Sequence, residues 1–68
     1  MRQVVLAPGE GRYWVADCPS LPGCVSQGCS REEAIANIKE AIEVYTASLQ
    51  EDNLPVPEEN FGTLLVVV

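Results

Sequence analysis

The first 28 residues alternate between short β-prone runs and clusters of proline and glycine. Residues 4–6 (VVL) precede a turn segment at 8–11 (PGEG), and residues 12–17 (RYWVAD) form the next run. In that run, alternate side chains point to opposite faces of a strand, and both sets carry apolar bulk. After DCPSLPGC, residues 24–27 form a third short run that Gly28 ends. The pattern predicts a hairpin followed by a third strand.

The segment that begins with SREE at residues 30–33 predicts a helix. It is a capping box, in which the Ser30 hydroxyl accepts from the Glu33 amide and the Glu33 side chain reaches back to the Ser30 amide. Asp52 and Asn53 can end this helix, because Asn tolerates the left-handed conformation of a C-cap. Between these two ends, apolar residues recur at steps of three and four and form one stripe along the helix: Ile35, Ile38, Ile42, Tyr45 and Leu49.

The remainder of the chain predicts an extended segment (LPVPEEN) and a final strand, FGTLLVVV, at residues 61–68. The element order is therefore β-β-β-α-β, an α+β fold in one domain spanning residues 1–68. One helix covers only one face of a sheet, so the opposite face needs another cover. We expect self-association into a homodimer or homotetramer, with Trp14, Val66 and Val67 at or near the subunit contacts.

Composition and charge narrow the partners that such a domain would bind. Ten acidic and four basic residues give a net charge of −6, and no basic stripe is available for phosphate contacts. We therefore expect no direct binding of nucleic acid, and a basic protein suits the charge better. The chain contains no apolar run of the roughly 20 residues that a membrane span needs, and no signal peptide. These features predict a cytoplasmic protein without a membrane partner.

Three cysteines and no histidine restrict the chemistry of the chain. Cys18, Cys24 and Cys29 have the spacing C-x5-C-x4-C, which lacks the C-x2-C pair of most zinc sites. Cysteine nucleophiles normally work with a histidine base. We therefore expect three free thiols, no metal, no cofactor and no catalytic residues. Asp17, beside Pro19, has two readings: it either caps the following turn or contacts a partner.

The segment DCPSLPGC, at residues 17–24, connects two of the predicted strands. Pro22 and Gly23 suit the two central positions of a type II turn, since proline presets φ at the first and glycine accepts a positive φ at the second. Cys24 resumes a strand after this turn. The segment therefore predicts a rigid, shaped connection between two strands.

A family resemblance covers residues 13–59, YWVADCPSLPGCVSQGCSREEAIANIKEAIEVYTASLQEDNLPVPEE. The stretch resembles the N-terminal domain of HicB-family antitoxins: an aromatic strand, a P-x-LPGC turn, a small strand ending in Gly, a capped helix and a D…P.P tail. The resemblance implies a degenerate ribonuclease-H-like β-β-β-α-β fold. It also implies a role in binding and masking a small, basic, messenger-RNA-cleaving toxin of the HicA type.

Two properties of related proteins are not expected here. Full-length HicB proteins usually carry a C-terminal DNA-binding domain, which we do not expect in residues 1–68. A ribonuclease-H site needs several converging acidic residues, and the predicted strands offer only Asp17. A stand-alone oligomeric ligand-binding or scaffold protein without a toxin is the alternative function. The expected partner-binding residues lie in and beside the turn: Asp17, Pro19, Leu21, Pro22 and Gly23.

Overall fold

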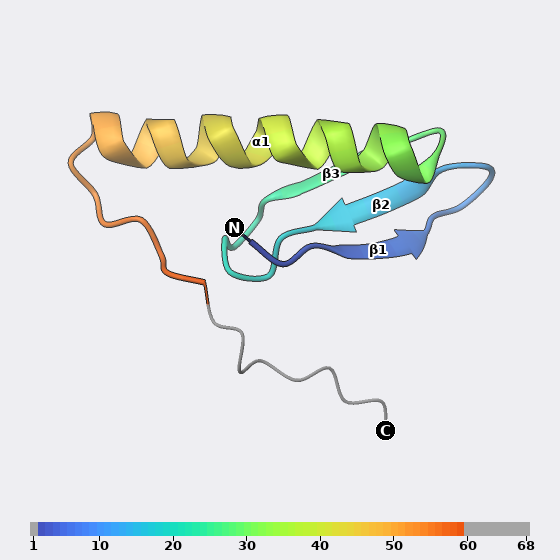
Figure 1. Ribbon diagram of the computed structural model, residues 1–68, viewed down its shortest axis with the longest axis horizontal. Helices are drawn as coiled ribbons and strands as arrows, with labels where there is room; N and C mark the ends of the chain where they lie inside the picture. Colours follow the sequence, from blue (N-terminus) through green and yellow to red (C-terminus); the bar gives the residue numbers. More distant parts are fainter. Residues whose placement is uncertain (1, 60–68) are drawn as a thin grey trace, which may run out of the picture.

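The computed structural model describes residues 2–59 of the 68-residue chain. It contains three strands and one helix, β1 (Val5–Pro8), β2 (Trp14–Asp17), β3 (Val25–Gly28) and α1 (Arg31–Glu51). The strands form one antiparallel sheet in the order β1-β2-β3, and α1 lies across one face of it (Figure 1). The α+β class and the β-β-β-α order are therefore confirmed. The final strand expected at 61–68 lies outside the described residues, and with it the ribonuclease-H-like assignment.

The register of the sheet places alternate rows of side chains on opposite faces. Leu6, Ala16 and Ser26 are directly opposite one another and face α1. Val5, Asp17 and Val25 form the adjacent row and lie on the other face. Because α1 covers only the first face, the second face is uncovered by any element within residues 2–59.

The N-terminus of α1 is capped as the sequence predicts, with one correction. The Ser30 hydroxyl accepts a hydrogen bond of 3.0 Å from the Glu33 amide. The Glu33 carboxylate reaches back to the Cys29 amide at 3.1 Å, one residue earlier than the Ser30 amide that we expected. The Glu33 side chain thus still pairs a backbone amide immediately before the helix, as in a capping box.

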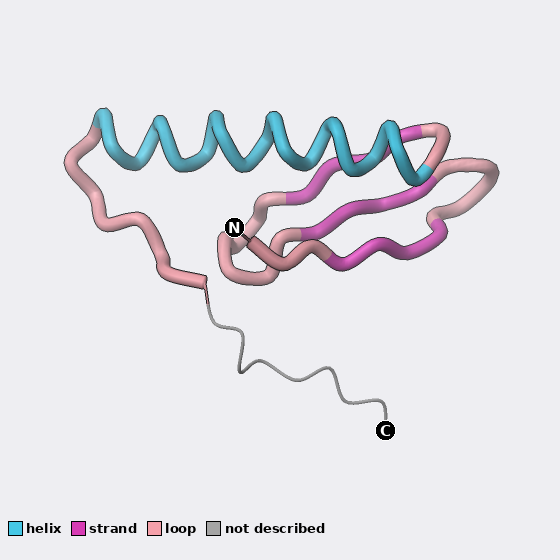
Figure 2. The backbone as a smooth tube through the Cα atoms, in the orientation of Figure 1, coloured by secondary structure: helices cyan, strands magenta, loops and turns pink. Residues whose placement is uncertain are grey.

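The C-terminus of α1 ends in a Schellman motif. Asn53 has φ of 56°, and its amide donates to the Gln50 carbonyl at 3.1 Å. The Leu54 amide donates to the Leu49 carbonyl at 2.8 Å. Both bonds satisfy carbonyls that have no partner inside the helix. The chain then turns back beneath the helix as a loop (Figure 2).

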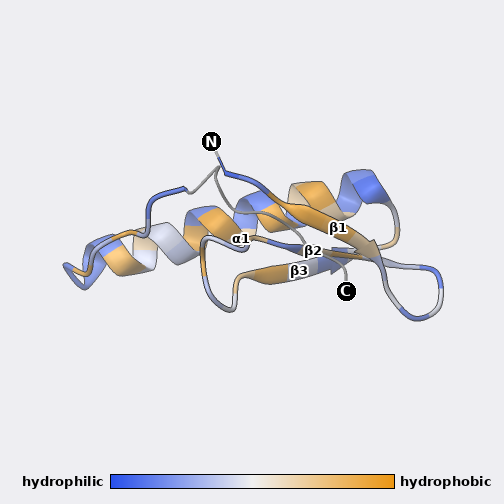
Figure 3. Ribbon diagram, turned by 90° about the horizontal axis from the view of Figure 1, so that it is seen from below, coloured by the Kyte–Doolittle hydropathy of each residue, from blue (hydrophilic) through white to orange (hydrophobic). Residues whose placement is uncertain are grey.

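The core lies between α1 and the sheet. Figure 3 shows apolar residues along β1 and in bands along α1 that alternate with hydrophilic ones, and it shows hydrophilic residues in the loop between β1 and β2. Gly28 lets the helix approach closely, because a Cβ atom at this position would lie 2.5 Å from the Ala34 amide nitrogen. Among residues 2–59, six side chains are buried: Ala16, Cys18, Leu21, Cys24, Ala34 and Ile38.

Candidate partner-binding surface

The segment between β2 and β3 consists of two consecutive turns closed by one backbone bond. The Leu21 amide donates to the Cys18 carbonyl, and the Cys24 amide donates to the Leu21 carbonyl, each at 3.0 Å. Pro19 and Pro22 occupy the second position of the first and second turn, where a fixed φ is favourable. The Cys18 amide then donates to the Cys24 carbonyl at 3.0 Å and closes the segment. We refer to residues 18–24 as the double turn.

The second of these turns has the geometry that the sequence predicts. Gly23 has φ of 79°, which is the left-handed conformation required at the third position of a type II turn. A Cβ atom at Gly23 would meet nothing within 4 Å, so the glycine is needed for its backbone conformation and not for space. The type II turn at Pro22–Gly23 is thus confirmed.

Buried side chains hold the double turn from inside the protein. Leu21, Cys18 and Cys24 all belong to the core, with Leu21 fully buried. On the helix side, the Tyr45 hydroxyl donates a hydrogen bond of 3.0 Å to the Pro22 carbonyl. The conformation of the double turn is therefore set by packing and by α1 as well as by its own backbone bonds.

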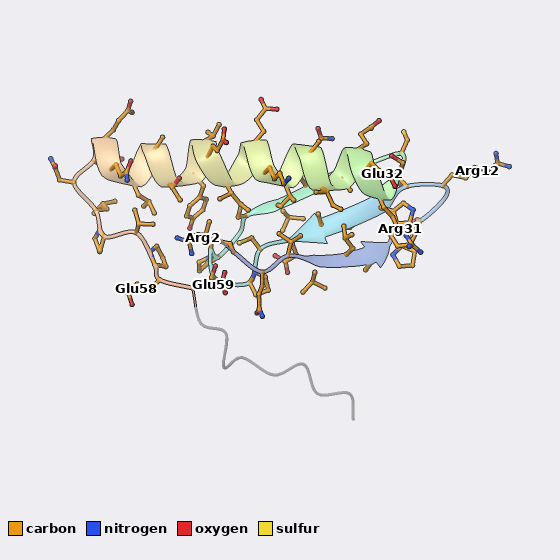
Figure 4. The ribbon with its side chains drawn as sticks, viewed as in Figure 1. Arg2, Arg12, Arg31, Glu32, Glu58 and Glu59 are labelled. Carbon is orange, nitrogen blue, oxygen red and sulfur yellow. The ribbon has the colours of Figure 1, made fainter. Side chains whose placement is uncertain are left out.

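The N-terminal segment and the tail also meet the double turn. The Arg2 guanidinium donates to the Ser20 hydroxyl at 3.0 Å and to the Pro57 carbonyl at 2.6 Å. The Ser20 hydroxyl donates to the Glu59 carboxylate at 3.3 Å, and the same carboxylate accepts from the Gln3 amide at 2.8 Å. Figure 4 shows Arg2 and Glu59 close together below the helix, far from Arg12 and Arg31. Three segments distant in sequence are thus joined at Ser20.

The five residues expected to bind a partner divide into exposed and buried positions. Asp17, Pro19, Pro22 and Gly23 are exposed along one side of the molecule. The side chain of Leu21 is fully buried, so it shapes this surface by anchoring the double turn from within. Within residues 2–59, no hydrogen bond or ion pair of the Asp17 carboxylate fixes the turn, and this leaves the carboxylate open to solvent.

The residues expected at subunit contacts are placed only in part. Trp14 is half-buried on the face that α1 covers, and the Arg31 guanidinium lies 4.6 Å from the centre of its ring. This geometry is that of a cation–π contact within one chain. Val66 and Val67 lie outside the described residues. On the uncovered face of the sheet, Val5 and Val25 are 40% and 53% exposed.

The three thiols differ in their surroundings. Cys18 and Cys24 are buried, whereas Cys29 is exposed, and all three are free. Burial raises the pKa of the Cys24 thiol, and the neighbouring Cys18 and Asp17 raise the pKa further. The thiol is thus kept protonated, which is the unreactive form. Across residues 2–59, no group of three His, Cys, Asp or Glu side chains could hold a metal ion.

Sequence reasoning missed two groups that fix the double turn, Arg2 and Tyr45. Tyr45 is part of the predicted apolar stripe, but the acceptor of its hydroxyl is fixed only by how α1 lies on the sheet. Arg2 carries no local signal, because its partners are 18 and 55 residues away.

The described part of the chain contains no helix long and apolar enough to span a membrane.

Comparison with known proteins identifies the family. Residues 3–63 match the family described as the HicB-like antitoxin of bacterial toxin–antitoxin systems. A UPF0150 protein of Thermoplasma acidophilum is 44% identical over 63 residues, which cover 93% of this chain and 91% of that protein. A UPF0150 protein of Synechocystis is 58% identical over 51 residues, which cover 75% of this chain and 63% of that protein. No solved structure matches this chain. The chain belongs to the HicB-like antitoxin family.

Proposed function

We propose that this protein binds a small, basic, messenger-RNA-cleaving toxin of the HicA type and masks its active site. Membership of the HicB-like antitoxin family carries the proposal, because the match extends over residues 3–63. The antitoxin acts by binding and not by catalysis. It acts on a protein and not directly on nucleic acid, since its net charge is −6. We also propose that the chain has the degenerate ribonuclease-H-like fold that the family resemblance implies.

The proposed toxin-binding surface is the exposed side of the double turn, with Asp17 beside it. The order of this turn supports the proposal, because three backbone bonds of 3.0 Å and the side chains of Tyr45 and Arg2 hold it in place. A surface that is already ordered loses little conformational entropy on binding. The exposed carboxylates of Asp17 and Glu58 would steer a basic partner toward it.

We also propose that copies of the chain associate into a homodimer or homotetramer. The uncovered face of the sheet supports this, because a 68-residue chain buries little apolar surface alone. Light scattering at micromolar concentration tests it. A particle heavier than 7.4 kDa is expected, and a particle of 7.4 kDa would reject the oligomer.

Co-expression tests the toxin-binding function. The protein encoded in the neighbouring reading frame is first shown to arrest growth when it is expressed alone. Co-expression of this chain is expected to restore growth, and the two proteins are expected to purify as a complex. Continued arrest without a complex would reject the antitoxin function and favour the stand-alone oligomer.

A further inference from the structure

The two edge strands of the sheet differ in what their outer backbone groups can do. In an antiparallel pair, hydrogen-bonded and non-hydrogen-bonded residue pairs alternate. The bonds from Gly9 to Tyr13 (2.9 Å) and from Cys18 to Cys24 (3.0 Å) fix this alternation for both strand pairs. Residues in non-hydrogen-bonded pairs direct their N–H and C=O groups away from β2. The register therefore identifies which backbone groups each edge offers.

The outer edge of β1 is blocked within the chain itself. Pro8 is opposite Trp14 in a non-hydrogen-bonded pair, so its missing N–H is on the outer side. Proline on an outer strand is a common protection against pairing with another chain. The tail also lies beside the start of this edge, where Arg2 and Gln3 bond to Pro57 and Glu59.

The outer edge of β3 is open by comparison. Val25 is opposite Asp17 and Gln27 is opposite Val15, both in non-hydrogen-bonded pairs that direct backbone groups outward. The outward Gln27 carbonyl accepts a hydrogen bond of 2.7 Å from the Asn37 side chain. The N–H and C=O groups of Val25 and the N–H of Gln27 have no partner within residues 2–59. Neither proline nor a charged side chain protects this strand.

A groove runs between this open edge and α1. Its volume is about 480 Å³, and β3 and the helix line its two sides. Val25 and Val44 in its lining are 53% and 64% exposed. Glu40 is the one charged residue among those that line it. Two cations, Arg2 and Lys39, line a separate groove together with Glu43.

We propose that the toxin docks by adding an extended segment to the outer edge of β3 as a further strand. The proposal rests on the proposed function and specifies how the partner is held. The outward groups of Val25 and Gln27 would bond to the added backbone, and Val44 would contact its apolar side chains. A basic segment fits, because Glu40 is unopposed by any cation in the groove lining. A second copy of the chain fits less well, because it brings another net charge of −6.

Substitutions at the edge test the proposal with the protein from the neighbouring reading frame, prepared as a catalytically inactive toxin. Val25→Pro removes the outward N–H without breaking a bond to β2, and Val25→Thr is its control because it keeps the N–H. We expect Val25→Pro to weaken toxin binding by about tenfold or more, and Val25→Thr to change it by less than about threefold. Urea unfolding verifies that both variants are folded. Equal affinity for folded Val25→Pro and the wild type would overturn the proposal.

Charge-reversal substitutions distinguish which of the two grooves binds the toxin. Glu40→Lys and Glu43→Lys change the net charge equally and lie on the same helix, but they line different grooves. Glu40→Lys is expected to slow association with the toxin and to reduce its salt dependence, and Glu43→Lys is expected to do so less. Equal effects of the two reversals would overturn the basic-segment assignment.

Amide hydrogen exchange gives a second measurement on the unmodified protein. The Val25 and Gln27 amides should gain protection when the inactive toxin is added, whereas the outward Leu6 amide of β1 should not. Failure of the wild type to bind the toxin would reject the proposed function together with this docking mode. Binding without new protection at Val25 and Gln27 would reject the docking mode alone. Protection that rises with the concentration of the free protein would assign the edge to a second copy.

Discussion

The hydroxyl of Tyr45, in the C-terminal half of α1, donates a hydrogen bond of 3.0 Å to the Pro22 carbonyl in the double turn. This bond joins the helix to the segment that we propose as the toxin-binding surface. The type II turn directs the Pro22 carbonyl toward the helix, and the apolar stripe of α1 brings the Tyr45 ring over the core. The hydrogen bond between Tyr45 and Pro22 thus depends both on the type II turn and on how α1 packs against the sheet.

Tyr45→Phe tests this contact because it removes the hydroxyl and keeps the ring. We expect the free energy of unfolding to fall by about 0.5–1.5 kcal/mol in urea titration. Tyr13→Phe is the control, since the Tyr13 hydroxyl makes no hydrogen bond within residues 2–59. If Tyr45→Phe and Tyr13→Phe destabilise the protein equally, the bond does not hold the turn.

Gly28→Ala tests the close approach of α1 to β3. The new Cβ would lie 2.5 Å from the Ala34 amide nitrogen, so the helix must shift away from the sheet. We expect a loss of about 1–3 kcal/mol in the free energy of unfolding. Gly9→Ala is the matched control, because its Cβ would meet the Tyr13 ring, which can rotate away. A wild-type melting temperature for Gly28→Ala would contradict the packing described here.

Ile38→Ala tests which part of the helical stripe forms the core. Ile38 is fully buried, whereas Ile35, on the same stripe, is 37% exposed. Ile38→Ala should therefore cost about 2–5 kcal/mol through a cavity, and Ile35→Ala about 1 kcal/mol or less. Thermal unfolding of the two variants measures the difference. The reverse order would place the buried face of α1 elsewhere.

Alkaline titration tests the environment of Cys24. Burial raises the pKa of this thiol above its ordinary value of 9.0, so the folded protein holds the proton longer than the unfolded chain does. The unfolded state then binds fewer protons, and the free energy of unfolding falls as the pH rises through that value. At lower pH, the contribution of the Cys24 thiol to the free energy of unfolding does not vary with pH. Cys24→Ala should flatten the alkaline decline, whereas Cys29→Ala should leave it unchanged because Cys29 is exposed.

The local features of the fold were predictable from the sequence, because each has a short-range cause. The type II turn follows from Pro22–Gly23, and the helix start follows from the hydroxyl of Ser30. The exact partner of the Glu33 carboxylate was not predictable, since the amides of Cys29 and Ser30 are both within its reach. The capping-box pattern favoured the Ser30 amide, and the structure places the carboxylate on the Cys29 amide.

Long-range features of the candidate site were not predictable from the sequence. Arg2 meets Pro57 only because the tail turns back below α1, and it meets Ser20 only through the fold of the double turn. Leu21 reads as a turn residue in the sequence, but the double turn directs its side chain into the core. The difference between the two sheet edges depends on the strand register, which no local pattern determines.

Titration of toxin activity tests the central claim most directly. The proposed HicA-like toxin, if the neighbouring reading frame encodes it, is held at constant concentration with an RNA substrate, and this protein is added in steps. We expect the cleavage rate to fall in proportion to the protein added and to reach zero at a fixed molar ratio. We also expect the affinity to weaken as salt is raised, because opposite charges attract the two proteins. An unchanged cleavage rate in excess antitoxin would contradict the account.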